Sequence, residues 1–211
     1  MGGDGGGEST RQRTGLVVPE VTVVPAGPEE WPDVETLLGR DQDRGCWCQY
    51  WRLSSSAYSA RGPGGPVMRA RLDLQPAPGM LAHIGEEVVG WCGIGPRTEM
   101  ERLSRSRTIP RIDDRPVWSI VCFLVRVGYR RQGVAQALLA GVVDYARQRG
   151  AIGLEAYPID VEGRRVDVAF AYVGTTSMFA RAGFRRVVET ASRSAGRPRW
   201  LMRLDLDPGA S

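Results

Sequence analysis

The sequence of 211 residues contains no lysine, because all 28 of its basic residues are arginine, and it has a single histidine, His83. A P-loop needs a lysine beside the nucleotide phosphates, and Schiff-base chemistry needs a lysine amine. A Ser-His-Asp triad or a multi-histidine metal site draws on histidine. The composition therefore argues against all four of these classes of site.

Long hydrophobic runs are also missing. No apolar run approaches the roughly 18–20 residues that span a bilayer, and the first residues have no apolar core of a secretory signal. We therefore expect a cytoplasmic protein without membrane contact. Residues 1–17, rich in glycine and charge, predict a flexible tail. With 42% hydrophobic residues, the chain can form a sizeable core, and we expect residues 18–208 to be a single domain.

Cysteine is scarce, with four residues at positions 46, 48, 92 and 122. The first two form a C-x-C pair, whereas a zinc ribbon uses two C-x-x-C pairs, so we expect no metal and four reduced thiols. The net charge of +4 is too small to indicate a nucleic-acid binder by itself, and it serves an anionic small ligand equally well.

Hydrophobic periodicity predicts an α/β fold in the order β-α-α-β-β-β-α-β-α-β-β, with helices on the faces of a mixed sheet. The expected strands are residues 21–24, 80–84, 88–94, 117–125, 152–157, 186–190 and 200–206, and the expected helices are 29–38, 67–74, 133–150 and 175–182. Residues 97–116 hold six arginines and four carboxylates with little apolar content, which predicts a long functional or mobile connection.

The most informative segment is FLVRVGYRRQGVAQALL, residues 123–139, in which a buried strand leads through a turn into the longest helix. The first N–H groups of a helix have no partner within the helix, and the helix dipole adds about half a positive charge there. Gly133 and Ala135 leave space for a pyrophosphate to approach the backbone, and Arg130 and Arg131 add cationic donors. This segment therefore predicts a phosphate-binding turn.

The turn resembles the R-x-x-G-x-G/A signature of the GCN5-related N-acetyltransferase (GNAT) superfamily. The resemblance continues through Leu-Glu-Ala at 154–156 and Ala-Gly-Phe at 182–184, covers about residues 19–206, and extends to a bacterial subgroup. It implies a mostly antiparallel mixed sheet flanked by helices, with acetyl-CoA as co-substrate in a V-shaped opening between the two central parallel strands. By position, the implied cofactor-binding residues are Phe123, Leu124, Val125, Arg130, Arg131, Gln132, Gly133, Val134, Ala135 and Gln136.

Acetyl transfer to an amine needs a base, a polarised carbonyl and a thiolate that leaves. Glu155 matches a glutamate that serves as base in some members of the superfamily, and the alternative is a carboxylate ion-paired to an arginine. Tyr157, two residues further on the same strand face, is a candidate proton relay.

Two positions depart from the family pattern. Phe179 stands where a tyrosine often protonates the thiolate, so Tyr172 is the substitute candidate, unless the thiolate leaves without help. The carboxylate expected on the strand at 117–125 is missing, and Ser119 and Cys122 lie in that region. We expect Cys122 to be a core residue, with an acyl-carrying nucleophile as the alternative.

The acceptor side is expected around the segment GCWCQYWR. By position in the superfamily, Trp47, Tyr50, Trp51 and Arg52 would line the acceptor pocket, which favours an acceptor with an apolar or aromatic body and a negative group. The alternative is that these aromatic residues cover the core. Asp160 is expected to cap a turn, with a substrate anchor as the other reading.

The leading prediction is therefore an acetyl-CoA-dependent N-acetyltransferase that acts on an amine of a small molecule or protein by direct attack, without a metal. The alternative is a non-catalytic module that binds or senses acyl-CoA. A nucleic-acid binder that uses residues 97–116 is disfavoured by the interspersed carboxylates. The edge strands at the end of the chain permit a homodimer.

Overall fold

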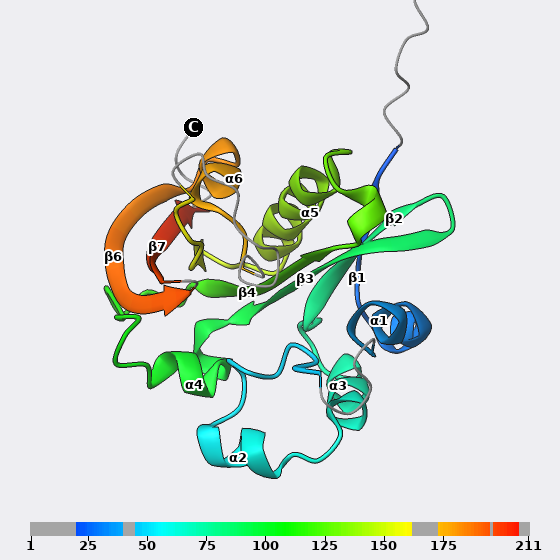
Figure 1. The fold of residues 1–211 in the computed structure, drawn as a ribbon, viewed down its shortest axis with the longest axis horizontal. Helices are drawn as coiled ribbons and strands as arrows, with labels where there is room; N and C mark the ends of the chain where they lie inside the picture. Colours follow the sequence, from blue (N-terminus) through cyan, green and yellow to red (C-terminus); the bar gives the residue numbers. More distant parts are fainter. Residues whose placement is uncertain (1–19, 40–44, 162–172, 195, 207–211) are drawn as a thin grey trace, which may run out of the picture.

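A computed structural model describes residues 20–39, 45–161, 173–194 and 196–206, which form one seven-stranded sheet in the order β1-β2-β3-β4-β5-β7-β6 (Figure 1). Only β4 and β5 run parallel, and every other neighbouring pair is antiparallel. The strands are β1 (Thr22–Pro25), β2 (Gly79–Ile84), β3 (Glu87–Pro96), β4 (Trp118–Val125), β5 (Gly153–Ala156), β6 (Arg185–Ser194) and β7 (Arg197–Asp205). The predicted mixed, mostly antiparallel sheet is confirmed.

Helices cover both faces of this sheet. In Figure 1, α5 and α6 lie on one face, and α1, α2, α3 and α4 lie on the other. The helices are α1 (Trp31–Leu38), α2 (Ser55–Ala60), α3 (Gly64–Leu72), α4 (Glu101–Ser104), α5 (Val134–Gln148) and α6 (Thr176–Arg181), with short 3-10 turns at Pro28–Glu30, Arg97–Glu99 and Val127–Tyr129. None of the helices described is both long and apolar enough to cross a membrane.

The core consists of two hydrophobic clusters, one on each face. On the α5 face, the apolar side of the helix, including Leu138 and Val142, packs on strand residues such as Ile120. On the α1 face, Leu37 of α1 packs in a cluster with Trp91 of β3. The sheet therefore separates two packed hydrophobic clusters.

Two helices were not predicted from the sequence. The segment of α2, SSAYSA, has no apolar repeat, and the helix forms behind an N-cap at Ser54, whose side chain accepts a hydrogen bond from the N–H of Ala57 at 3.1 Å. The connection at 97–116, predicted as irregular, contains the turn at Arg97–Glu99 and α4. The tail predicted for residues 1–17 lies outside the described residues.

The glycines of β3 allow other elements to approach the sheet closely. A Cβ atom on Gly90 would lie 2.8 Å from Leu138 Cδ1 of α5, and one on Gly93 would lie 2.3 Å from Cys48 Sγ. Because both distances are shorter than real Cβ contacts, a side chain at either position would force Leu138 or Cys48 to shift.

The parallel pair separates soon after it forms. Pairing between β4 and β5 runs from Trp118 opposite Leu154 to Ile120 opposite Ala156 and stops there, although β4 continues to Val125. Within the described residues, the later half of β4 therefore has a strand partner only in β3.

A bulge lies at the same point of β4. Gly93 is paired with Cys122 and Ile94 with Ile120, so Val121 is an extra residue in β4. As a result, Val121 and Cys122 both belong to the α1 face of the sheet. From Cys122 onward, beyond the last residue paired with β5, the side chains of β4 again alternate between the two faces of the sheet.

Candidate active site

The turn before α5 has the backbone of an anion-binding site. Arg131 and Gly133 have φ angles of 64° and 83°, in the left-handed region. The N–H groups of residues 131–135 make no hydrogen bond to any residue that the structure describes, whereas those of Gln136 and Ala137 donate to the carbonyl oxygen of Gly133 at 2.9 and 3.0 Å. Unpaired N–H groups at a helix N-terminus match the acceptor oxygens of a phosphate.

A hollow of about 360 Å³ opens at these N–H groups. Its lining contains three arginines and no carboxylate: Val125, Tyr129, Arg130, Arg131, Gly133, Val134, Ala135, Gln136, Thr175, Met178 and Arg181. A Cβ atom on Gly133 would meet nothing within 4 Å, so the space above this residue is open. The hollow therefore fits a pyrophosphate in both charge and hydrogen bonding.

The hollow adjoins the unpaired half of β4. Val125, the last residue of this strand, lines it. The ring of Phe123 turns into the core, where it packs edge-on against Phe179 with ring centroids 6.5 Å apart, and Phe179 packs against Phe184 at 5.1 Å. Phe123 can therefore offer a ligand only its backbone, and Phe179 is a fully buried core residue.

Glu155 is ion-paired to two arginines at the start of the parallel pair. Arg97 Nη1 lies 2.8 Å from Glu155 Oε2, and Arg203 Nη2 lies 2.6 Å from Oε1. The hydroxyl of Tyr157 also donates to Oε2 at 2.8 Å, and it lies 2.9 Å from Ser119 Oγ. Of the two readings that the sequence left open for Glu155, the ion pair is the one the geometry shows.

In this network, Glu155 is not accessible to take a proton from an acceptor. Glu155 is 1% exposed, and both of its oxygens are occupied by donors. Burial and the adjacent charge of Glu155 raise the pKa of the Tyr157 hydroxyl well above its ordinary value, so this hydroxyl keeps its proton. The third predicted catalytic residue, Tyr172, lies outside the described residues.

Two thiols, Cys48 and Cys122, belong to the hydrophobic cluster on the α1 face of the sheet. A hydrogen bond from the Cys122 thiol, helped by the charge of Arg52, lowers the pKa of Cys48 to about 6 against the cost of burial. The same hydrogen bond and burial raise the pKa of Cys122 well above its ordinary value. Within the described residues, no three His, Cys, Asp or Glu side chains gather in a group that could hold a metal.

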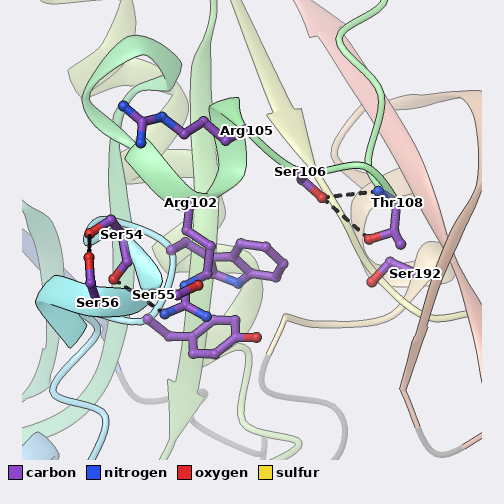
Figure 2. A pocket seen from close by; sticks show the side chains of 10 residues that line it. Ser54, Ser55, Ser56, Arg102, Arg105, Ser106, Thr108 and Ser192 are labelled. Atoms are coloured by element: carbon purple, nitrogen blue, oxygen red, sulfur yellow. Dashed lines mark hydrogen bonds between the residues drawn. The ribbon is translucent and has the colours of Figure 1, made fainter. Parts of the chain in front are cut away.

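The structure does not bring the four predicted acceptor residues together. Tyr50 and Trp51 line a cavity of about 590 Å³ (Figure 2). Trp47 instead stacks on Trp31 and lines a different hollow. Arg52 is buried, and its Nη2 donates to the carbonyl oxygens of Pro78 and Ile94 at 2.6 and 2.8 Å.

The cavity of about 590 Å³ lies between α2, α4 and β6 (Figure 2) and is called the acceptor cavity below, because two of the four residues predicted to bind an acceptor line it. Its lining also contains hydroxyls and arginines that were not singled out from the sequence: Ser54, Ser55, Ser56, Arg102, Arg105, Ser106, Thr108 and Ser192. The excess of arginine at 97–116 was the one available signal for two of them. Asp160 does not line this cavity, and its carboxylate is ion-paired to Arg186.

Residues 32–162, more than half of the chain, match the family model described as the acetyltransferase (GNAT) family. The chain belongs to the GNAT acetyltransferase family. Solved structures with the same fold include the Salmonella typhimurium acetyltransferase yncA with its cofactor acetyl-CoA, at 15% identity and a TM-score of 0.53 over 90% of this chain and 96% of that one. Among curated proteins, no sequence match is found.

Two further structures are similar to this GNAT acetyltransferase. The Corynebacterium glutamicum histone acetyltransferase HPA2 and related acetyltransferase has 19% identity and a TM-score of 0.54, over 90% of this chain and 99% of that one. Arabidopsis thaliana NAA60 in complex with acetyl-CoA has 17% identity and a TM-score of 0.50, over 88% and 99%. At these identities the likeness shows the fold.

Proposed function

We propose that this GNAT acetyltransferase transfers the acetyl group of acetyl-CoA to an amine of a small molecule or protein by direct attack. The observation that carries the proposal is the run of unpaired N–H groups at residues 131–135, which open into a hollow lined by three arginines at the end of β4. Similar folds have been solved with acetyl-CoA bound, which supports the same co-substrate here.

In this proposal the chain holds the co-substrate by its charged end and its amide-rich arm. Arg130, Arg131 and the N–H groups at the start of α5 bind the pyrophosphate. The backbone of residues 123–125 has no strand partner on the β5 side within the described residues, and Arg130 Nε donates to the Val125 carbonyl oxygen at 3.3 Å; the rest of this backbone is available to the pantetheine arm and the thioester carbonyl. When bound, acetyl-CoA supplies a thioester whose carbonyl carbon the amine attacks, with coenzyme A thiolate as leaving group.

The protons take routes that avoid the buried carboxylate. Because both oxygens of Glu155 are occupied by buried donors, the proton of the acceptor ammonium passes to water in the acceptor cavity. Tyr172 stays the proposed donor to the departing thiolate, on the strength of its place in the sequence. The N–C bond forms as the C–S bond breaks, the nitrogen releases its second proton to solvent, and solvent restores the proton that Tyr172 gave to the thiolate, so no further reactant is needed.

A second candidate function is favoured by one observation. Glu155 is locked in ion pairs and Phe179 is buried, so neither supplies acid-base catalysis at its family position. A non-catalytic module that binds acyl-CoA would have the same phosphate site and no turnover.

One pair of measurements separates the two functions. Calorimetric titration with acetyl-CoA tests the phosphate site, and thiol release with a panel of amines on the same sample tests transfer. Binding with turnover supports the transferase, and binding without turnover on any amine class supports the acyl-CoA module. Absence of binding contradicts both functions.

A further inference from the structure

The acceptor cavity contains hydrogen-bond donors and positive charge but no carboxylate in its lining. Two arginines and six Ser or Thr hydroxyls line it together with Tyr50 and Trp51. In Figure 2, Arg102 lies beside the aromatic rings, and Ser106, Thr108 and Ser192 lie across the cavity from it. Such a lining complements a ligand that has anionic oxygens and an apolar body.

Arg102 is the cation best placed to bind such a ligand. Its guanidinium carbon lies 4.3 Å from the ring centroid of Tyr50 and 5.3 Å from that of Tyr58, so the head group is held against two aromatic rings. Its only hydrogen bonds to described residues are long ones of 3.4 Å, to the carbonyl oxygens of Leu53 and Ser54. No carboxylate of the described residues is paired with it, so its charge is available.

The other arginine of the cavity differs in this respect. Arg105 Nη1 lies 3.0 Å from Glu101 Oε1, and the side chain of Arg105 is 75% exposed. Its charge is therefore already balanced and largely in solvent. Arg102 is half-buried and unbalanced, which makes it the residue that distinguishes an anionic ligand from a neutral one.

Spare hydroxyls accompany Arg102. The hydroxyls of Ser55 and Ser192 make no hydrogen bond to any described residue. Those of Ser54 and Ser106 are engaged with neighbouring backbone N–H groups. A ligand in the cavity therefore finds one cation and at least two free hydroxyls, which come from α2 and β6.

The acceptor cavity also lies on the face of the sheet where transfer is proposed. Trp51 lines the cavity and packs against the same hydrophobic cluster as Cys122 and Leu124 of β4. These two residues lie on the part of β4 that β5 has left. An acceptor seated over Trp51 therefore lies on the same face of the sheet as this part of β4.

We propose that the acceptor is an amine with an apolar body and an anionic group, carboxylate or phosphate, and that Arg102 selects it by binding that group. The inference rests on the proposed acetyl transfer and adds the substrate class. Arg102 acts as a specificity-determining residue, because it binds the acceptor away from the reacting amine.

The test measures binding by calorimetry with three probes: 3-phenylpropionate, phenyl phosphate and the neutral 3-phenylpropionamide. We expect at least one anion to bind roughly tenfold or more tightly than the amide, since a charge-assisted hydrogen bond to a carboxylate or phosphate is strong. The tighter of the two anions identifies the group. Arg102→Gln is expected to abolish the preference, and Arg107→Gln, which removes a neighbouring exposed arginine outside the cavity lining, is expected to keep it.

Acetyl-CoA is titrated into the same three proteins. Equal binding of all three probes, no binding of either anion, or a preference that survives Arg102→Gln would overturn the inference. Unchanged acetyl-CoA affinity in Arg102→Gln shows that the variant is folded and that the phosphate site is separate. If the wild-type protein does not bind acetyl-CoA, the proposed function is contradicted instead. The failure of the proposed function is therefore distinguishable from the failure of the inference about Arg102.

Discussion

Arg203 Nη2 of β7 lies 2.6 Å from Glu155 Oε1 of β5, and the two side chains are 3% and 1% exposed. Arg97 binds the other oxygen of Glu155, and Arg203 also binds the carboxylate of Asp113. Three segments distant in the sequence are therefore joined by one buried carboxylate beside the opening of the sheet. Removal of a single partner leaves buried charge without compensation.

Glu155→Gln is expected to destabilise the protein by about 3–5 kcal/mol, because it leaves Arg97 buried without a counter-charge and Arg203 with Asp113 alone. Thermal or urea unfolding measures this loss. The matched control is Glu189→Gln, which changes an exposed side chain of β6 and should alter the free energy of unfolding by no more than about 0.5 kcal/mol. A Glu155→Gln protein with wild-type stability and a rate that falls at neutral pH would restore Glu155 as the base.

Gly133→Glu is expected to abolish acetyl-CoA binding. The substitution puts a negative charge into the open space above the α5 N-terminus, where φ is 83°. Calorimetry is the measurement. Gly150→Glu is the control, because Gly150 also has open space and a φ of 75° but lies beyond the other end of α5, about 22 Å away. Equal binding by the two variants would place the pyrophosphate elsewhere.

Cys48 is expected to titrate as a thiolate with a pKa of about 6, which ultraviolet thiolate absorbance measures. Because its pKa in the unfolded chain is near the ordinary value of 9.0, the unfolded state binds more protons between these values. The contribution to stability is therefore complete above about pH 9 and is lost as the pH falls through 6.

Two cysteine variants check this assignment. Cys48→Ala should lose the low titration and the rise in melting temperature between pH 6 and 9. Cys46→Ala removes an exposed thiol and should keep both. A low titration that persists without Cys48 would assign the thiolate to another residue.

Gly93→Ala is expected to destabilise the protein by about 1–3 kcal/mol, because the new Cβ atom would lie 2.3 Å from Cys48 Sγ. Denaturant unfolding gives the value. Gly128→Ala meets nothing within 4 Å and should be neutral or slightly stabilising. Similar losses in both variants would show that backbone freedom, rather than the contact with Cys48, limits position 93.

The parts of the fold that follow from local patterns were predictable from the sequence. The buried run of β4 and the apolar side of α5 gave the central strand and the longest helix, and Gly133 marked the turn between them. The α2 segment has no apolar period, so nothing in it predicts a helix apart from the Ser54 cap. The strand β6 runs to Ser194, past the predicted end at residue 190, because register shifts against β7 allow a polar segment to pair.

The candidate site was predictable only where it is built from one segment. The phosphate-binding turn is continuous in sequence, whereas Glu155 meets Arg97 and Arg203 through contacts 58 and 48 residues apart. Similarly, Arg52 and Arg102 look alike in the sequence. Packing buries the first against backbone carbonyls and leaves the second in a cavity.

The extra residue in β4 determines which chemistry faces which side. With Val121 present, Cys122 and Leu124 point to the α1 face and Phe123 points to the α5 face. If Val121 were paired regularly instead of bulged, these sides would be exchanged, with Phe123 on the α1 face and the Cys122 thiol in the aromatic core of the α5 face. The bulge at Val121 thus decides whether the α1 face of the later half of β4 carries the Cys122 thiol or the Phe123 ring.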